Sequence, residues 1–161
     1  MDASIPRDPL GILKTVFGYP SFRSRQGEII ENVLAGRNTL AILPTGAGKS
    51  LCFQIPALIF EGLTVIVSPL IALMKDQVDG LKKRGVRDVA YINSTLDHSA
   101  KERVYEQLRD SKLKMLYLAP ETFVDDKLMR VLKSSNISLI AIDEVHCISI
   151  WVITSDPIIY G

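Results

Sequence analysis

The sequence alternates short runs of β-branched and apolar residues with longer amphipathic stretches, and this alternation constrains the fold more than any other feature. The short runs predict strands at residues 39–43, 63–67, 89–92, 114–118 and 137–142. The longer stretches predict helices at residues 25–35, 49–60, 70–84, 99–110 and 126–134. Strands 63–67 and 137–142 are apolar nearly throughout, as is usual for strands buried on both faces of a parallel sheet. The pattern therefore predicts an α/β fold, a parallel sheet with helices on both faces.

The composition is typical of one soluble domain. The chain has 161 residues, 47% of them hydrophobic, and its 19 basic and 18 acidic residues give a formal net charge of +1. This balance provides no general electrostatic attraction to nucleic acid, so DNA binding would depend on particular residues. No apolar run reaches the ~20 residues of a membrane helix, and residues 1–10 are unlike a secretory signal. Cys52 and Cys147 lie among apolar residues, which favours a reducing interior. We therefore expect a cytoplasmic protein without membrane contact.

A glycine-containing segment directly after the first predicted strand has the character of a phosphate-binding loop. It reads Leu43-Pro-Thr-Gly-Ala-Gly-Lys-Ser50. Gly46 and Gly48 allow several backbone N–H groups to point at one anion, and a helix that begins near Gly48 would direct its N-terminus there too. Lys49 adds positive charge near the β- and γ-phosphates, and the Ser50 hydroxyl can bind Mg²⁺. A Gly-Lys-Ser triplet can occur by chance in a turn, but the strand before it and the helix after it favour phosphate binding.

Two carboxylates follow the last predicted strand. Asp143-Glu-Val-His146 comes directly after residues 137–142. The Asp143 carboxylate can hold Mg²⁺ at the end of a buried strand, and Glu144 can accept the proton of an attacking water. Acidic residues also simply terminate strands, so the pair alone is weak evidence. Combined with a phosphate loop on another strand of the same sheet, it predicts nucleoside triphosphate binding, with hydrolysis as the accompanying chemistry.

With these two sites in place, the chain resembles the first RecA-like lobe of the RecQ family of DNA helicases, from Leu13 to Ser149. Phe17-Gly-Tyr-Pro-Ser-Phe-Arg-Ser-Arg-Gln26 is similar to the adenine-recognition motif of that family. The resemblance implies that Tyr19 stacks on the base, that Gln26 hydrogen-bonds its edge and that Arg23 assists nearby. A glutamine amide offers both a donor and an acceptor, which matches adenine N6 and N7.

The resemblance also assigns nucleotide and DNA contacts. Residues 43–50 are similar to the phosphate loop of the family, which commonly lacks the first glycine. The implied nucleotide-binding residues of this loop are Thr45, Gly46, Ala47, Gly48, Lys49 and Ser50. Residues 67–77 and 93–95 are similar to two motifs that contact single-stranded DNA. The implied DNA contacts are Ser68, Pro69, Leu70, Asn93, Ser94, Thr95 and Trp151. Residues 118–121 resemble a further DNA-contacting motif, although Glu121 can equally be an acid at the start of a helix.

Residues 143–146 are similar to the Asp-Glu-Ala-His motif of the family, with Val145 in place of alanine. The implied catalytic residues are Lys49, Asp143 and Glu144. Ser50 and Asp143 would bind the metal, and His146 would couple the nucleotide state to the DNA-binding face. The implied cofactors are ATP and Mg²⁺, and the implied partner is single-stranded or partly duplex DNA. Such a protein would be associated with the nucleoid in a prokaryote or lie in the nucleus of a eukaryote.

The resemblance ends after Ser149. RecQ proteins continue with a tryptophan followed by Gly-His-Asp-Phe-Arg, of which only Trp151 has a counterpart. We therefore expect an incomplete RecA-like (P-loop NTPase) lobe at residues 1–149 and a divergent tail of unknown role at residues 150–161. In RecA-like sheets, the strand of the missing Ser/Thr-Ala-Thr motif lies between the phosphate-loop strand and the Asp-Glu strand. Residues 151–155 follow strand 137–142 too closely for a parallel crossover, so we expect the sheet to lack this strand. The chain would then be marginally stable, or it would repack and misplace Lys49 relative to Asp143.

The preferred function is the ATP-binding, DNA-contacting lobe of a RecQ-like ATP-dependent DNA helicase. Unwinding requires two lobes that move relative to each other, so this lobe is not expected to unwind DNA alone. An arginine from the second lobe contributes ~10³–10⁵ in rate, so hydrolysis by this chain alone should be very slow. The alternatives are a non-catalytic nucleotide- or DNA-binding module, a truncated product without function, and a small P-loop kinase. In a kinase the adenine motif and the Ser-Pro-Leu segment would have no role.

Overall fold

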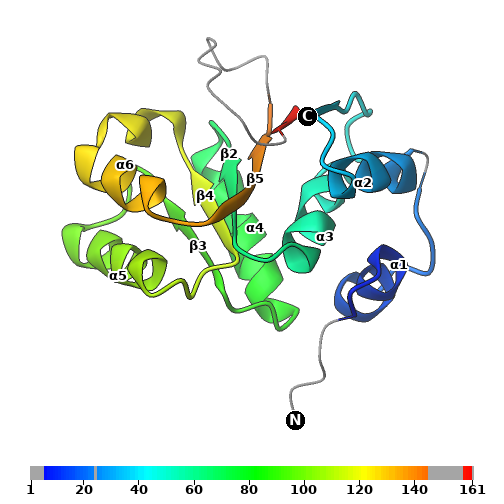
Figure 1. Ribbon diagram of the computed structural model, residues 1–161, viewed down its shortest axis with the longest axis horizontal. Helices are drawn as coiled ribbons and strands as arrows, with labels where there is room; N and C mark the ends of the chain where they lie inside the picture. Colours follow the sequence, from blue (N-terminus) through cyan, green and yellow to red (C-terminus); the bar gives the residue numbers. More distant parts are fainter. Residues whose placement is uncertain (1–5, 24, 145–157, 161) are drawn as a thin grey trace.

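A parallel sheet forms the centre of the structure, a computed structural model that describes residues 6–23, 25–144 and 158–160. The sheet has the strand order β1-β6-β5-β2-β4-β3, and every neighbouring pair is parallel (Figure 1). Its strands are β1 (Thr39–Leu40), β2 (Leu63–Val67), β3 (Val89–Ile92), β4 (Met115–Leu118), β5 (Ile137–Ile142) and β6 (Ile158–Tyr160). The predicted α/β class, with a parallel sheet and helices on both faces, is confirmed.

The helices connect the strands in the predicted alternation. They are α1 (Pro9–Ile12), the π-helix η1 (Leu13–Phe17), α2 (Gln26–Leu34), α3 (Leu51–Ile59), α4 (Ile71–Lys83), α5 (His98–Arg109), the 3₁₀ helix η2 (Pro120–Val124) and α6 (Asp126–Lys133). The five long helices lie within a few residues of their predicted bounds, whereas α1, η1 and η2 were not predicted. In the described parts of the chain, no helix has the length and apolar character needed to cross a membrane.

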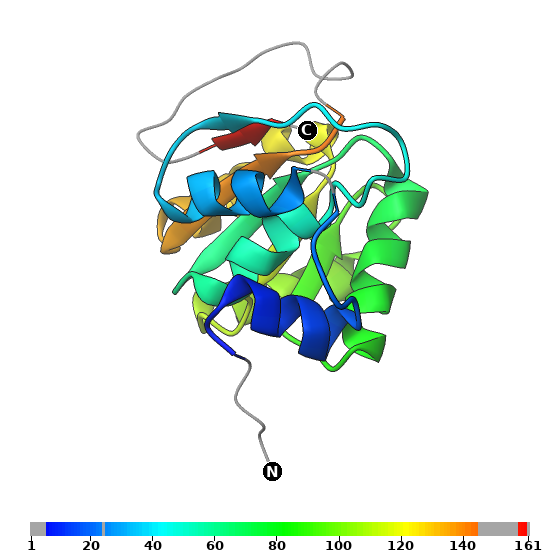
Figure 2. The same cartoon turned by 90° about the vertical axis from the view of Figure 1, so that its right-hand side faces the viewer.

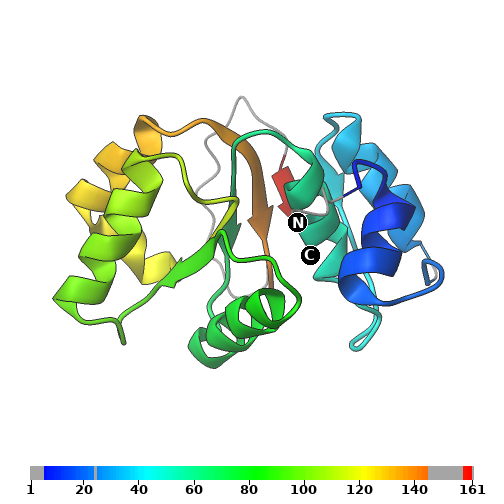
Figure 3. The same ribbon diagram turned by 90° about the horizontal axis from the view of Figure 1, so that it is seen from below.

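Side chains of each central strand alternate between two hydrophobic clusters, one on each face of the sheet. On β4, Met115 and Tyr117 join the cluster that contains residues of η1, α2, α3 and α4. Leu116 and Leu118 point the other way, into the cluster formed with α5 and α6. Figure 3 shows the two groups of helices on opposite sides of the strands. Because successive strand residues face opposite sides, the near-continuous apolar sequence of these strands follows from this double covering.

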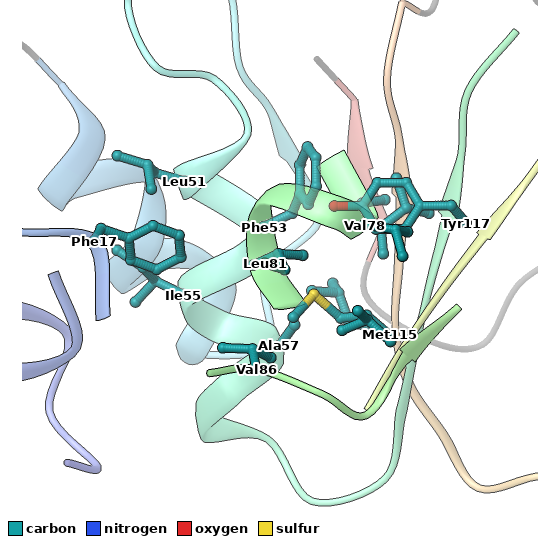
Figure 4. Packing of buried hydrophobic residues seen from close by; sticks show 14 of the residues in the cluster. Phe17, Leu51, Phe53, Ile55, Ala57, Val78, Leu81, Val86, Met115 and Tyr117 are labelled. Atoms are coloured by element: carbon teal, nitrogen blue, oxygen red, sulfur yellow. The ribbon is translucent and has the colours of Figure 1, made fainter. Parts of the chain in front are cut away.

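The larger cluster connects helix α3, which follows residues 43–50, to the centre of the sheet. Phe53 and Ile55 of α3 share this cluster with Leu81 of α4 and with Met115 and Tyr117 of β4 (Figure 4). Ile55 and Met115 have no solvent-exposed surface. The position of α3 is thus set by its burial against the sheet. This packing also fixes the C-terminal end of residues 43–50, which lead directly into α3.

Strand β6 corrects the expectation that the sheet lacks a strand between β1 and β5. The backbone of residues 158–160 pairs with both neighbouring strands (Figure 2). Ile159 lies opposite Thr39 of β1 and Ala141 of β5. The prediction considered residues 151–155, which leave too short a connection from β5. Residues 143–157 supply the dozen or more residues that a parallel crossover requires. The proposed division of the chain at residue 150 remains a prediction, but residues 158–160 belong to the same sheet as β1–β5.

Two local predictions also differ from the structure. The phosphate-loop strand is shorter than residues 39–43, because only Thr39–Leu40 pair as β1. Helix α5 begins at His98, one residue before the predicted bound: Asp97 is the N-cap, and its Oδ1 accepts a hydrogen bond from the Ala100 N–H at 2.7 Å. The aspartate competes successfully with Ser99 because it accepts from the same turn and also bonds the Ser99 hydroxyl.

Asp125 joins α5 to α6, and its replacement by alanine should destabilise the chain by about 1–2 kcal/mol. Its carboxylate caps α6 by accepting from the N–H groups of Lys127 and Leu128, and it also accepts from the Tyr105 hydroxyl at 2.8 Å. The Tyr105 hydrogen bond is the main reason that the pKa of Asp125 lies below its ordinary 3.8. Asp125→Asn would retain part of this cap and should lose less stability, as measured by urea unfolding.

The pH dependence of this contribution has a defined sign. Because the folded-state pKa of Asp125 is lowered, its carboxylate stabilises the fold fully above the ordinary value of 3.8. The contribution disappears as the pH falls below that value toward the folded pKa. The difference in unfolding free energy between wild type and Asp125→Ala should therefore be constant near neutral pH and shrink in acid. A difference that grows in acid would contradict this assignment.

Candidate functional site

The predicted functional residues gather at one edge of the sheet. All strands are parallel, so their carboxyl ends share this edge, where loops of α/β proteins bind ligands. The phosphate loop follows β1, Ser68 follows β2, Asn93 follows β3 and Asp143 follows β5. The Asp143 N–H donates to the Val67 carbonyl at 2.9 Å, which fixes the end of β5 beside the end of β2.

The phosphate loop has the backbone conformation that its glycines were predicted to allow. Gly46 and Gly48 have φ angles of +80° and +74°, in the left-handed region. A Cβ at position 48 would also lie 2.5 Å from the Gln26 Nε2, so both conformation and space require glycine there. Helix α3 begins at Leu51 rather than near Gly48, and Ser50 makes no side-chain capping hydrogen bond. Its hydroxyl is thus not used by the helix.

Gln26 is bound to the phosphate loop. Its side chain is 2% exposed, and its Nε2 donates to the carbonyls of Ala47 at 2.8 Å and Gly48 at 3.1 Å. Its Oε1 accepts from the Arg23 N–H at 2.9 Å. The amide predicted to read an adenine edge therefore connects the adenine motif to the phosphate loop. Contact with a base would require at least one of these hydrogen bonds to be exchanged.

A cavity of about 310 Å³ lies beside the phosphate loop. Tyr19, Arg23 and Gln26 of the adenine motif line it together with Gly46, Gly48 and Ser50. Tyr19 is 40% exposed, and the Arg23 guanidinium lies 5.6 Å from the centre of its ring. An aromatic face and a guanidinium plane at the mouth of a cavity suit stacking of a heterocyclic base.

The structure brings the phosphate loop and the carboxylate pair together. The Lys49 Nζ lies 3.6 Å from the Glu144 Oε1, and both side chains are about three-quarters buried. Glu144 has a φ angle of +61°, which is uncommon for a residue with a side chain. Backbone strain of this kind occurs at functional sites, where the surrounding structure holds it. The phosphate loop after β1 and the acidic pair after β5 thus form one charged site, although β6 lies between these two strands in the sheet.

Asp143 has the electrostatics of a cation ligand. Burial raises the pKa of its carboxyl, the neighbouring Glu144 raises it further, and Lys49 acts in the opposite direction. A divalent cation would favour the ionised carboxylate and remove this penalty. Within the described residues, no group of three His, Cys, Asp or Glu side chains gathers in one place. The oxygens of Ser50 and Asp143 instead fit Mg²⁺, which typically takes one or two protein ligands and completes its shell with water and phosphate.

Asp143→Asn should raise the stability of the chain at neutral pH. The folded-state pKa of Asp143 is raised, so the protonated form is favoured in the fold and stability decreases as the pH rises through that pKa. Asparagine has the same shape without the charge. Thermal unfolding should therefore show a higher Tm for the variant at pH 7 and a smaller difference below pH ~4. A lower Tm at neutral pH would show that the carboxylate has a structural partner.

The predicted DNA contacts divide into buried and exposed groups. Ser68 is 2% exposed, and its Oγ accepts from the Leu70 N–H at 3.4 Å. Asn93 is 1% exposed, and its Oδ1 accepts from both the N–H and the hydroxyl of Thr95. These two side chains shape their loops. Leu70, Ser94 and Thr95 are exposed at the edge of the sheet, and Pro69 is half-buried.

Of the remaining predicted residues, the structure places only Glu121. Glu121 is exposed in the first turn of η2, as expected for an acid at the start of a helix. Because the side chain is exposed, the structure is also compatible with the predicted contact to DNA. His146 and Trp151 lie outside the described residues.

Sequence reasoning missed a buried polar network behind the phosphate loop. Gln54 of α3 is 4% exposed, and its Nε2 lies 2.5 Å from the Gln77 Oε1 and 3.0 Å from the Tyr117 hydroxyl. Burial raises the pKa of Tyr117, which keeps its hydroxyl protonated. A lone glutamine within the apolar helix 51–59 was the only signal for this network. It connects α3, which follows the phosphate loop, to α4, which follows the Ser-Pro-Leu segment.

Comparisons with known proteins identify the family to which the chain is similar. The DEAD/DEAH box helicase family matches residues 23–157. The chain is 47% identical over 142 residues to an ATP-dependent DNA helicase RecQ of Pasteurella multocida, covering 88% of this chain and 22% of that protein. It is 48% identical over 144 residues to the RecQ helicase of Bacillus subtilis, covering 87% and 24%.

A solved structure shows the same fold. A hypothetical ATP-dependent RNA helicase from Sulfolobus tokodaii superimposes with a TM-score of 0.67 at 22% identity, covering 81% of this chain and 39% of that one. The predicted similarity to RecQ helicases is confirmed by the sequence relatives, of whose length the chain spans about a quarter or less. Since the family match extends over most of the chain, this protein belongs to the DEAD/DEAH box helicase family.

Proposed function

We propose that this chain is the ATP-binding and DNA-contacting lobe of a RecQ-like ATP-dependent DNA helicase. The observation that carries the proposal is the approach of the Lys49 Nζ to the Glu144 Oε1 at 3.6 Å. It unites the phosphate loop with the acidic pair, and these are the two halves of a nucleotide-hydrolysing site. The family membership and the RecQ relatives support the same conclusion.

Each residue of the site has a distinct role in this proposal. The Lys49 ammonium binds the β- and γ-phosphates, and the N–H groups of residues 45–50 bind the remaining phosphate oxygens. Ser50 and Asp143 hold Mg²⁺, which neutralises charge on the phosphates when it is bound. Once a phosphate draws Lys49 away, Glu144 can accept the proton of the attacking water. Tyr19 and Arg23 hold the base at the cavity mouth.

The DNA strand is proposed to follow the edge of the sheet beside this site. The exposed Leu70, Ser94 and Thr95 lie in loops that follow β2 and β3. Hydroxyl and backbone N–H groups of such loops contact phosphates without reading base sequence. A second RecA-like lobe would complete the machine and supply the arginine that accelerates hydrolysis.

Titration of the purified chain with Mg·ATP and with a single-stranded oligonucleotide tests this function. Calorimetry should show binding of both ligands, while phosphate release remains close to background without a second lobe. Binding of ATP without turnover even after addition of the remaining helicase domains would favour a non-catalytic module. Absence of ATP binding would refute the proposal.

A further inference from the structure

Helix α4 lines part of the cavity beside the phosphate loop. From the sequence, the start of this helix was expected only to contact DNA. The cavity that Tyr19, Arg23 and Gln26 line is also lined by residues of α4 and by the residue directly after it, namely Asp76, Gln77, Gly80, Leu81 and Arg84. Arg84 follows Lys82 and Lys83 at the end of α4. The structure shows that its guanidinium lies 5.9 Å from the centre of the Phe17 ring, beside the same cavity.

Asp76, Gly80 and Arg84 form a stripe along α4. They are spaced four residues apart, so they lie on one face of the helix and follow one another along its axis. A Cβ at Gly80 would meet no heavy atom within 4 Å, which leaves the middle of the stripe open to the cavity. The carboxylate of Asp76, the open surface at Gly80 and the guanidinium of Arg84 therefore follow one another along the cavity wall.

The acidic end of the stripe lies nearest the phosphate loop. Gln77, the neighbour of Asp76, contacts Gln54, which is one helical turn beyond Ser50. Asp76 and Ser50 line the same cavity. Arg84 is eight residues further on, about 12 Å along the axis. A nucleotide whose phosphates lie in the loop would therefore meet the acidic end of the stripe before its basic end.

Asp76 also differs from the acidic residue three positions along the same helix. Asp79 forms a salt bridge with Lys75 at 2.6 Å. In the described part of the chain, the Asp76 carboxylate has no hydrogen bond or salt bridge. Its carboxylate can accept hydrogen bonds but donates none, and it repels phosphate. The donors of a nucleotide nearest the phosphates are the ribose hydroxyls, and carboxylates bind these in other nucleotide sites.

We propose that α4 forms the nucleoside wall of the ATP site, with Asp76 accepting hydrogen bonds from the ribose hydroxyls and Gly80 leaving room for the base. This inference rests on the proposed function, because it assigns further residues to the same site. It makes helix α4 a determinant of ribonucleotide specificity. The helix then has one end near the DNA-contacting loop and one face on the nucleotide.

Calorimetric titrations with Mg·ATP, Mg·2′-deoxy-ATP and Mg·tripolyphosphate test the inference. Asp76→Ala should weaken ATP binding about tenfold and remove the preference for ATP over 2′-deoxy-ATP, because a charge-assisted hydrogen bond is lost. Tripolyphosphate binding, which needs only the phosphate loop, should not change. Asp79→Ala on the same helix is the matched control and should bind all three ligands as wild type does.

A second pair of variants tests the open surface at position 80. Gly80→Gln should fill the cavity and weaken ATP binding at least tenfold while tripolyphosphate still binds; glutamine also favours a helix more than glycine does, so folding is retained. Ala72→Gln adds the same side chain to an exposed position of α4 outside the cavity and is the control. If both Asp76→Ala and Gly80→Gln bound ATP with wild-type affinity, the inference about α4 would be overturned and the proposed function would stand. A wild-type chain that binds neither ATP nor tripolyphosphate would refute the proposed function and the inference together.

Discussion

Lys49→Ala is expected to abolish the stabilisation of this chain by Mg·ATP. At a ligand concentration 100 times the dissociation constant, binding adds about 2.7 kcal/mol to the unfolding free energy of the wild type. The ammonium group is the only formal positive charge within the phosphate loop, residues 43–50, and no neighbouring side chain of that loop can replace it. Thermal unfolding with and without Mg·ATP should therefore show a ligand-dependent rise in Tm for the wild type and almost none for the variant.

The same substitution should have a small effect on the chain without ligand. The ion pair between Lys49 and Glu144 is partly exposed and its atoms are 3.6 Å apart, and such pairs contribute ~1 kcal/mol or less. This separates a loss of ligand binding from a loss of folding. Lys133→Ala, at the exposed end of α6, is a suitable control and should retain the full ATP effect. If Lys49→Ala kept the wild-type response, ATP would bind somewhere other than the phosphate loop.

Ile159→Pro should produce the largest loss of stability, about 3 kcal/mol, because it places proline in an interior strand. The backbone of Ile159 lies between Thr39 of β1 and Ala141 of β5. Proline removes a backbone donor and cannot fit the centre of a sheet without distortion. A loss of this size is a large part of the 5–15 kcal/mol that stabilises a typical domain.

This variant should also lose ATP binding, which distinguishes it from an ordinary destabilising change. Strand β1 leads into the phosphate loop and β5 leads into Asp143, so separation of the two strands would move Lys49 away from the acidic pair. Urea unfolding and ATP titration of the same samples measure both effects. Ile159→Val retains a β-branched side chain and a backbone N–H and serves as the control. If Ile159→Pro unfolded and bound ATP as wild type, β6 would not connect β1 to β5.

Sequence patterns predicted the regular elements well where local chemistry and burial agree. Strands 63–67, 89–92 and 137–142 have the predicted bounds, because apolar and β-branched residues with polar flanks both favour and delimit a buried strand. The phosphate loop was equally predictable, since Gly46 and Gly48 have the positive φ angles that non-glycine residues avoid. The start of α5 lies one residue before its predicted bound, because Asp97 and Ser99 are both good capping residues and Asp97 caps the helix.

The candidate site was only partly predictable. The residue types of Lys49, Ser50, Asp143 and Glu144 indicate phosphate and metal chemistry wherever they meet. The sequence contains no information on the contact of Gln54 with Gln77 and Tyr117, since these residues come from three separate elements. The role of Gln26 was likewise expected to concern adenine, but the folded chain uses its amide on the phosphate loop.

By itself, the sequence determined the α/β class, the phosphate loop and the acidic pair, because each depends on residues that are neighbours along the chain. Only the tertiary structure decided that residues 158–160 pair between β1 and β5, and that α4 lines the nucleotide cavity. Both depend on contacts between segments far apart in sequence, and a three-residue strand has too weak a local pattern to be predicted. Its pairing is decided by the unfilled hydrogen-bonding edges of the two strands that it joins.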